Sequence, residues 1–400
     1  MKNKKVFLIL MYKDYEVLSF EVTCGNRNKI RIIEKLKHFD KAPYEINEAD
    51  SKGNINVALF NFFASRCIPS QRSDYKKIIK YTNSINAFEL SFKGHGLSLS
   101  NHYWFKRENE DLKYEDINFF TNKWDDSFAR AVLNDKYKDL MNVDLNVPDI
   151  LTPGWGVKGW ICEDDGPKLY KLGINKSHSE EAICEVLASR LANRILSEGE
   201  ALKYELKKIN KQYASVSPLM INIDEELISL SKAIDEKTYL LYRNKNLDKA
   251  NWEQFLDAIK GSKIPGLYEF FIKLSCFRDL CFVSDLHFGN ISFIKNNKTG
   301  EIRVAPLYDL GGAFGSTRTG KNLIANPNKA TYILIYYLFN DFDPSWDYSW
   351  YDKDKLIGFE DEIRDMLSLS EFYSPQLIDS IIEVYHHQKA LLDEMVESDK

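Results

Sequence analysis

The sequence lacks the features that most directly assign a protein to a metal-binding or membrane class. Its six cysteines form no CxxC pair and no cluster with histidines, so a structural zinc site is not indicated. We interpret them as buried free thiols in a reducing cytoplasm. No stretch approaches the ~20 consecutive apolar residues of a membrane-spanning helix, and no small-residue cleavage site follows the apolar run 6–12. We therefore expect a cytoplasmic protein with no membrane partner.

An excess of charge of one sign is also missing. The net charge is −5, and the charged residues, 28% of the chain, are interspersed along it. A general nucleic-acid-binding protein normally carries a basic face, so we expect no direct contact with nucleic acid. The sequence contains no internal repeat and no low-complexity tract. These absences leave an ordinary globular protein as the expected class.

What the chain does contain is enough apolar material for more than one core. At 400 residues, 44% of them hydrophobic, it is expected to fold into two or three packed units. Two prolines and two glycines punctuate the stretch VPDILTPGWG, residues 147–156. We expect an N-terminal α/β domain over 1–145, a β-rich unit over 146–245 and a helical unit over 246–400.

Hydrophobic patterning predicts a mixture of hairpins and helices. Alternating residues, an Asp-Gly turn and the turn KNNKTG each indicate a hairpin, and recurrence every three to four positions indicates helices. The expected strands are 6–12, 15–22, 96–105, 160–163, 168–173, 204–209, 216–223, 291–294 and 301–305. The expected helices are 61–80 with a break at Pro69, one that follows a capping box at 177–180, 252–259, 266–283 and the tail from about 359.

Two short stretches in the helical half carry the chemistry. They read SDLHFGN (284–290) and APLYDLGGAFG (305–315), and a predicted hairpin joins them. The hairpin returns the chain to its starting point, so we expect Asp309 to lie beside Asn290, with Asp285 close by. Phosphoryl transfer requires hard oxygen ligands for Mg²⁺ and a base near the attacking hydroxyl. Either carboxylate alone would be explained as a turn cap, but the combination predicts a Mg·ATP site.

Together the two stretches resemble the catalytic loop and the metal-binding segment of the HipA-like serine/threonine kinases. The resemblance implies an α+β, bilobal protein-kinase-like fold, with a β-rich nucleotide lobe and a helical C-lobe, that uses ATP and Mg²⁺. It implies that Asp285 is the catalytic aspartate and that His287 orients the loop. Asn290 and Asp309 fall on the two Mg²⁺ ligands of the family.

The stretch TPGWGVKGW (152–160) lies where a phosphate-covering loop would lie, just before a predicted strand. Gly154 and Gly156, like Gly159, would let backbone N–H groups approach phosphate oxygens. We assign Lys158 to the nucleotide site with them. A plain turn is the alternative interpretation of this stretch.

Lys171, on the second strand of the next predicted hairpin, resembles the ATP-contacting lysine of the family, and a solvated strand lysine is the alternative. Glu181 aligns with the apolar stripe of the following helix. A buried carboxylate needs a partner, and Lys171 is the natural one. Glu180 or Glu185 could take the place of Glu181.

The predicted strand 216–223 would be the hinge whose backbone meets adenine. Leu219, Met220 and Ile221 are all compatible with this contact, and Met220 is assigned. Candidate autophosphorylation sites are Thr152 beside the glycines and Ser316, Thr317 and Thr319 in the segment where an activation loop would lie.

The expected activity is transfer of the γ-phosphoryl group to a serine or threonine hydroxyl of a protein substrate. The resemblance also implies a small helix-turn-helix antitoxin as a possible partner and a role as a toxin or mobile-element regulator. One alternative is a small-molecule phosphotransferase of the aminoglycoside or choline kinase type, although Val283 replaces the histidine that those enzymes carry two residues before the aspartate. The other is a non-catalytic, nucleotide-binding pseudokinase.

Overall fold

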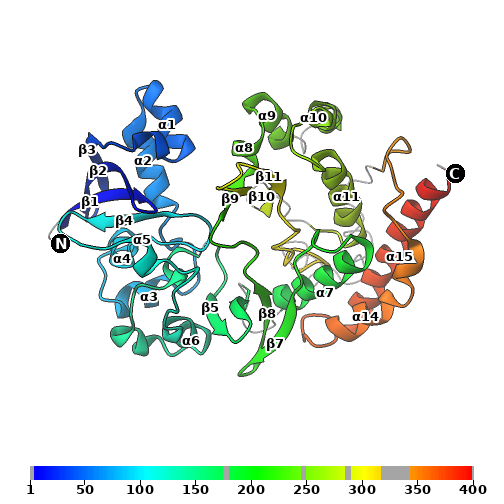
Figure 1. Cartoon of the computed structure of the whole chain (residues 1–400). Coiled ribbons are helices and arrows are strands. Elements are labelled where there is room, and N and C mark those ends of the chain that lie inside the picture. Colours follow the sequence, from blue (N-terminus) through cyan, green and yellow to red (C-terminus); the bar gives the residue numbers. More distant parts are fainter. Residues whose placement is uncertain are drawn as a thin grey trace. The chain divides into compact units, whose positions relative to one another are not determined.

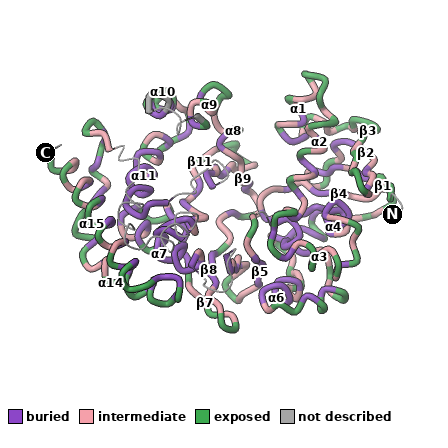
Figure 2. Tube along the Cα trace, turned by 180° about the vertical axis from the view of Figure 1, so that it is seen from behind, coloured by how far each residue is buried: buried purple, intermediate pink, exposed green. Residues whose placement is uncertain are grey.

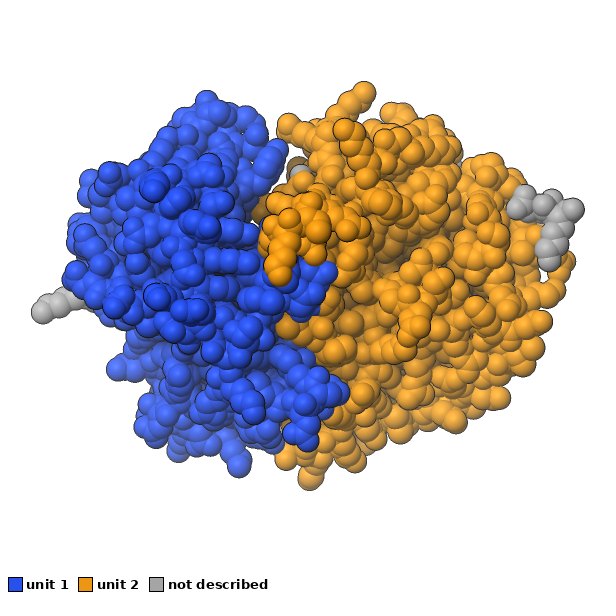
Figure 3. All heavy atoms as spheres, in the orientation of Figure 1, with its two compact units in different colours: residues 1–174, 221–226 blue, residues 175–220, 227–400 orange. Residues whose placement is uncertain are grey.

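The computed structural model describes residues 4–152, 154–173, 180–244, 249–283, 290–316 and 342–398. The chain divides into two compact units (Figure 3). Unit 1 comprises residues 1–174 and 221–226, and unit 2 comprises residues 175–220 and 227–400. Antiparallel sheets and helices occur in both units, so the α+β class is confirmed. The expected domain boundaries near 145 and 245 stay predictions.

Unit 1 begins with a four-stranded antiparallel sheet in the order β3-β2-β1-β4 (Figure 1). The predicted first hairpin is confirmed, since Leu8 pairs with Phe20 and Leu10 with Leu18 across β1 and β2. Its turn contains Lys13 in the left-handed region, with φ of 49°. The strands are β1 (Lys4–Tyr12), β2 (Tyr15–Cys24), β3 (Lys29–Lys35) and β4 (Tyr103–Arg107). The run 96–105 was expected to be extended throughout, but only its last residues pair in β4.

Aromatic side chains form the core between this sheet and the helices beside it. The rings of Phe63 and Phe105 stack with centroids 4.6 Å apart, and Phe20 meets both rings edge-on. The expected helix 61–80 is interrupted between Ala64 and Tyr75, in agreement with the break predicted at Pro69. The helices are α1 (Tyr44–Ser51), α2 (Ile55–Ala64), α3 (Tyr75–Tyr81), α4 (Ala87–Lys93), α5 (Tyr114–Ile117) and α6 (Ser127–Leu133), with short 3₁₀ turns η1 (Phe39–Lys41), η2 (Tyr137–Asn142) and η3 (Pro148–Leu151).

Unit 1 ends with the second predicted hairpin, β5 (Lys158–Glu163) and β6 (Gly166–Lys171). Its register runs from Lys158 opposite Lys171 to Glu163 opposite Gly166. Gly166 adopts φ of 120°, a conformation that glycine reaches without the steric cost a side chain would add. The Asp-Gly turn signal was therefore sufficient to locate this hairpin.

Unit 2 is mainly helical. Two hairpins accompany the helices, and β9 extends the second of them to the order β11-β10-β9. None of the helices in the described part of the chain has the length and apolar character needed to cross a membrane. The strands are β7 (Glu205–Ile209), β8 (Gln212–Pro218), β9 (Glu225–Ser229, in unit 2 from Leu227), β10 (Ser292–Asn296) and β11 (Ile302–Val304). The helices are α7 (Glu180–Ile195), α8 (Leu230–Ala233), α9 (Glu236–Asn244), α10 (Lys249–Lys260), α11 (Leu267–Leu280), η6 (Lys353–Leu356), α14 (Phe359–Leu367) and α15 (Pro375–Ser398).

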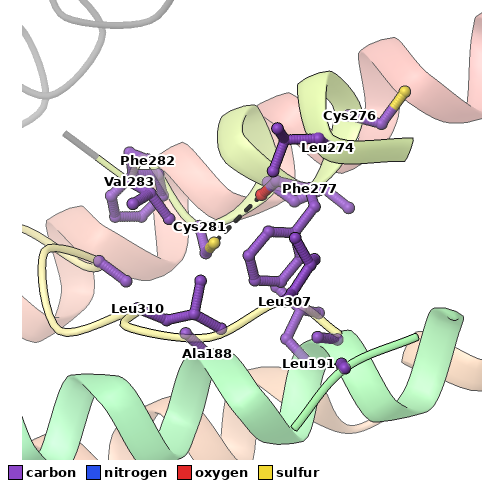
Figure 4. Close-up of a cluster of buried hydrophobic side chains, with 14 of the residues drawn as sticks. Ala188, Leu191, Leu274, Cys276, Phe277, Cys281, Phe282, Val283, Leu307 and Leu310 are labelled. Carbon is purple, nitrogen blue, oxygen red and sulfur yellow. Dashed lines mark hydrogen bonds between the residues drawn. The ribbon is translucent and has the colours of Figure 1, made fainter. Parts of the chain in front are cut away.

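The core of unit 2 packs α7 and α11 on either side of the segment that follows β11. Leu191 of α7 and Phe277 of α11 are fully buried, and Leu307 and Leu310 lie between the two helices (Figure 4). Buried positions run along both helices in the burial-coloured trace (Figure 2). Burying an apolar side chain of this size contributes about 1.5–3 kcal/mol. The segment after β11 is therefore held in place by the largest core of the unit.

Candidate functional site

The segment 305–316, which we call the metal segment, contains backbone conformations that are uncommon for residues with side chains. Asp309 has φ of 57° and Phe314 has φ of 49°, both in the left-handed region. Aspartate is one of the few residues that visits this region readily, because its short side chain can bond locally. Conformations of this kind cluster at functional sites, where the surrounding structure maintains them.

Hairpin β10–β11 brings the two ends of the predicted Mg²⁺ site to one side. Phe293 pairs with Val304, and the amide of Ala305 donates to the carbonyl of Ser292 at 3.0 Å. The hydroxyls of Ser292 and Tyr308 lie 2.6 Å apart. Asn290, whose exposure is 7%, precedes this contact and Asp309 follows it. The predicted hairpin is thus confirmed, and the pairing of the two side chains around a metal stays a prediction.

The hydroxyl of Tyr204 fixes the backbone at Asp309. It accepts a hydrogen bond from the Asp309 amide at 3.2 Å, and the Tyr204 amide donates to Ser189 Oγ of α7 at 3.0 Å. Ser189 Oγ in turn donates to the carbonyl of Leu202 at 2.7 Å. No pattern in the sequence indicates this role, because the run from Tyr204 has only the features of the start of a strand.

Backbone bonds on the N-terminal side of the metal segment tie it to the chain just before Tyr204. The amide of Leu202 donates to the carbonyl of Leu307 at 2.9 Å, and the Leu307 amide donates to the carbonyl of Glu200 at 2.8 Å. Residues Ala201 and Leu307 form an isolated parallel bridge. The segment 200–204, about a hundred residues earlier in the chain, therefore bonds both to the backbone just before Asp309 and to the amide of Asp309 itself.

The first turn of α7 lies against the metal segment. A Cβ at Gly311 would be 3.5 Å from the carbonyl oxygen of Glu181 and 3.8 Å from its Cβ. Of the alternatives to Glu181, Glu185 is 1% exposed and accepts a hydrogen bond from Ser215 Oγ of β8. The backbone of Glu181 thus lies beside Gly311, and Glu185 ties the helix to a strand. Lys171 belongs to unit 1, so its pairing with Glu181 stays a prediction.

Buried hydroxyl and thiol groups hold the C-terminal end of the metal segment. Tyr373 Oη donates to the carbonyl of Phe314 at 3.2 Å and lies 3.0 Å from Cys184 Sγ. The Phe314 amide donates to the carbonyl of Cys281 at 2.9 Å. Burial, with the neighbouring Cys184, raises the pKa of Tyr373 well above its ordinary value, and burial raises the pKa of Cys184 to about 12. Both groups stay neutral at physiological pH, as expected of an inert buried thiol.

The catalytic loop itself lies outside the described residues, which include neither Asp285 nor His287. The residues that lead into the loop, up to Val283, are described. Helix α11 ends at Leu280, Phe282 has φ of 43°, and the amide of Val283 donates to the carbonyl of Arg278 at 3.0 Å. The roles predicted for Asp285 and His287 stay predictions.

In unit 1 the residues predicted to meet phosphate form a tight turn, which we call the glycine loop (154–158). Gly154 has φ of 101°, and a Cβ there would collide with Lys158 Nζ. A Cβ at Gly156 would lie 2.8 Å from the carbonyl carbon of Gly173. Glycine is therefore favoured at 154 by its backbone conformation and at 156 by the close approach of Gly173, and the predicted contact of their amides with phosphate stays a prediction. Gly159 differs, because its Cβ position faces Ala129 and is needed for packing of α6 on β5.

The glycine loop presents two features suited to an anion. The amides of Gly154, Trp155 and Gly156 donate no hydrogen bond to any residue in the described ranges. Lys158, which is 8% exposed, pairs directly opposite Lys171 on the same face of the hairpin. Successive free amides form concavities that bind phosphate.

The expected hinge is displaced from its predicted strand. Strand β8 ends at Pro218, so Met220 lies in the turn that follows and not in a strand over 216–223. Proline has no N–H to donate to a sheet ladder, which explains the early end. The side chain of Met220 is half-buried and packs against the core of unit 2. The contact between Met220 and adenine stays a prediction.

Two candidate autophosphorylation sites are buried. Thr152 is 6% exposed, donates to the carbonyl of Pro148 at 3.1 Å and accepts from the indole of Trp160 at 3.1 Å. Ser316 is 5% exposed and donates to the carbonyl of Gly311. Both hydroxyls act as structural donors in this conformation. Thr317 and Thr319 lie outside the described residues.

The donors in the metal segment fit Mg²⁺ better than a softer metal. Within the described ranges, no group of three or more His, Cys, Asp or Glu residues could hold a metal ion. A carboxamide and a carboxylate at one end of a hairpin supply the hard oxygen ligands that Mg²⁺ uses together with waters and phosphates. Asn290 and Asp309 have the chemistry to hold Mg²⁺, and their role as its ligands stays a prediction.

Comparison with known proteins gives the following. No family model matches the chain, and no curated protein matches it in sequence. In structure it is similar to the proinflammatory kinase CtkA of Helicobacter pylori, with a TM-score of 0.44 and 15% identity, over 62% of this chain and 93% of that one. It is also similar to HipA of a Shewanella oneidensis MR-1 toxin–antitoxin system, solved with HipB and operator DNA, with a TM-score of 0.43 and 10% identity, over 98% of this chain and 99% of that one. At these values neither similarity assigns an activity, so function rests on the residues of the site.

Proposed function

We propose that this chain is an ATP- and Mg²⁺-dependent phosphotransferase that transfers the γ-phosphoryl group to a serine or threonine hydroxyl of a protein. The observation that carries the proposal is the conformation of Asp309. It is left-handed, lies at the end of a hairpin that starts near Asn290, and is fixed through its amide by Tyr204. A hairpin that only connects two elements would not need such fixation at one acidic residue.

The proposed roles follow from the chemistry of each group. Asp285 would accept the proton of the acceptor hydroxyl, and His287 would orient its loop. Asn290 and Asp309 would hold Mg²⁺. A bound Mg²⁺ would neutralise negative charge on the phosphates.

The nucleotide would be bound by the remaining assigned residues. The amides of the glycine loop would donate hydrogen bonds to phosphate oxygens, and Lys158 and Lys171 would add positive charge on the same face of their hairpin. Glu181 would orient Lys171, and the backbone near Met220 would meet adenine. The acceptor protein and a small helix-turn-helix partner both stay predictions from the sequence resemblance.

Incubation with radiolabelled ATP and Mg²⁺ tests the proposal. We expect label on the chain or on a lysate protein, a loss of at least about 100-fold in Asp285→Ala, and a loss in Asp309→Asn. Asp379→Asn is the matched control, because Asp379 is a surface residue of the same unit, 63% exposed and paired with Arg364. Labelling that persists in the two site variants would overturn the proposal.

Two other results would assign a different function. Transfer of label only to a sugar or amine would identify a small-molecule phosphotransferase. ATP binding without turnover under all conditions would identify a non-catalytic nucleotide-binding protein.

A further inference from the structure

Residues distant in sequence hold both ends of the glycine loop. The amide of Ser73 donates to the carbonyl of Trp155 at 3.1 Å. Arg72 Nη2 donates to the carbonyl of Lys158 at 3.0 Å. Arg72 and Ser73 thus fix the carbonyls on either side of Gly156 and Val157.

The guanidinium that makes the second contact is itself fixed. Arg72 Nε and Nη2 donate to the two carboxylate oxygens of Asp74 at 2.7 and 3.2 Å. The side chains of this pair are 0% and 3% exposed, and the hydroxyl of Tyr137 donates to Asp74 at 3.1 Å. Desolvating two charges is costly, so a buried pair is expected where its geometry has a use beyond attraction between the charges. Here the pair holds the Arg72 guanidinium in the position from which it donates to the carbonyl of Lys158.

A second buried carboxylate completes the support on the strand side. Asp149 Oδ1 accepts from the amide of Trp160 at 2.8 Å, and Asp149 is 0% exposed. A Cβ at Gly159 would lie 3.1 Å from that oxygen, which places Asp149 against β5 directly after the glycine loop. Burial raises the pKa of Asp149 to about 7, and the nearby Arg72 opposes part of that shift.

These contacts determine which backbone groups of the loop are available. Carbonyl oxygens repel phosphate, and the carbonyls of Trp155 and Lys158 are bonded to Ser73 and Arg72. The amides of residues 154–156 donate to nothing in the described part of the chain. A preorganised set of donors binds an anion more tightly than a loop that must first order itself.

We propose that Arg72, fixed by Asp74, is a positioning residue that holds the glycine loop in its phosphate-binding conformation. This inference rests on the proposed function and deepens it, because it makes nucleotide affinity depend on the N-terminal part of the chain. Arg72 need not touch nucleotide. Its effect is exerted through the carbonyl of Lys158.

The test compares Arg72→Lys with Arg130→Lys in the full chain. Lysine keeps the charge but cannot bond to a carboxylate and a carbonyl with one rigid fork. Arg130 is a matched control, because it also binds one carboxylate, that of Asp126, through Nε and Nη2 at 2.7 and 2.8 Å, and its side chain is 60% exposed. The measurements are the Kd values for Mg·ATP and for adenosine, and hydrogen exchange of the glycine-loop amides.

We expect Arg72→Lys to weaken Mg·ATP binding about two- to tenfold, to leave adenosine binding unchanged and to speed exchange at Val157, whose amide donates to the carbonyl of Gly173 at 3.3 Å. Arg130→Lys should change none of these. Unchanged Mg·ATP affinity in Arg72→Lys would overturn the inference. So would an equal loss of affinity for adenosine accompanied by faster hydrogen exchange of amides throughout unit 1, because both would then reflect a general loss of structure. Failure of the wild type to bind Mg·ATP would instead overturn the proposed function, and the phosphate role of Arg72 with it.

Discussion

In unit 1 buried acidic and basic side chains hold the glycine loop, whereas in unit 2 tyrosine hydroxyls beside an aliphatic core hold the metal segment. The loop depends on the Arg72–Asp74 pair and on Asp149. The metal segment depends on Tyr204 and Tyr373, whose hydroxyls bond to the backbone at Asp309 and Phe314. The two segments therefore differ in the chemistry of their supports.

The comparison shows two ways to hold a backbone segment in place where it is proposed to bind a charged ligand. Charged supports are strong but lose their value when one partner is removed, because the other charge is then buried alone. Hydroxyl supports contribute less each, and they leave no buried charge behind. We therefore expect the glycine loop to respond more to single substitutions and to pH than the metal segment does.

The largest expected effect breaks the charged support. Asp74→Ala should lower the free energy of unfolding by about 3–5 kcal/mol, because Arg72 would remain buried without its carboxylate. Asp126→Ala, which removes the partner of the exposed Arg130, should cost about 1 kcal/mol or less. Denaturation with urea measures both. Equal losses in the two variants would contradict the distinction between the supports.

A smaller effect is expected when the neutral support is broken. Tyr373→Phe should lower the free energy of unfolding by about 1–3 kcal/mol, since the carbonyl of Phe314 and the thiol of Cys184 would lose a buried partner. Tyr44→Phe is the control, because Tyr44 is 59% exposed, and it should have no measurable effect. The same urea series gives both values. A loss in Tyr373→Phe as large as that in Asp74→Ala would remove the contrast.

The smallest effect sharpens the comparison through pH. Burial raises the pKa of Asp149 to about 7, so the folded state binds a proton that the unfolded chain releases near pH 4. The contribution of Asp149 to the free energy of unfolding is complete below about pH 4, near the pKa of the unfolded chain. It is lost as the pH rises through about 7, the pKa of the folded state. Between about pH 6 and pH 8 the loss should be about 1 kcal/mol, and Asp149→Asn should abolish this part of the pH dependence. A slope unchanged in Asp149→Asn would assign it to other groups.

The metal segment should not share this pH dependence. Burial and the neighbouring Cys184 keep the pKa of Tyr373 well above its ordinary value, and the pKa of Cys184 is about 12. Neither group titrates between pH 6 and pH 8. Hydrogen exchange of the amides near Phe314, corrected for the intrinsic effect of pH, should therefore show no change in protection over that range.

The sequence alone determined the local parts of this protein. An Asp-Gly turn was enough to place hairpin β5–β6, and the turn after Asn296 placed hairpin β10–β11. The α+β class also followed from hydrophobic pattern and turn chemistry. Such features depend on residues a few positions apart, so one stretch of sequence contains all the information that they need.

Only the tertiary structure decided what supports those local parts. Arg72 lies 86 residues before the carbonyl that it binds, and Tyr204 lies 105 residues before Asp309. The strand expected over 216–223 was wrong beyond Pro218, where β8 ends, and its pairing with β7 ends at Val216, opposite Glu205, where β7 begins. Contacts over such separations are selected by the packing of a whole unit, since many side chains in the sequence have the right chemistry and only the fold brings one of them into reach.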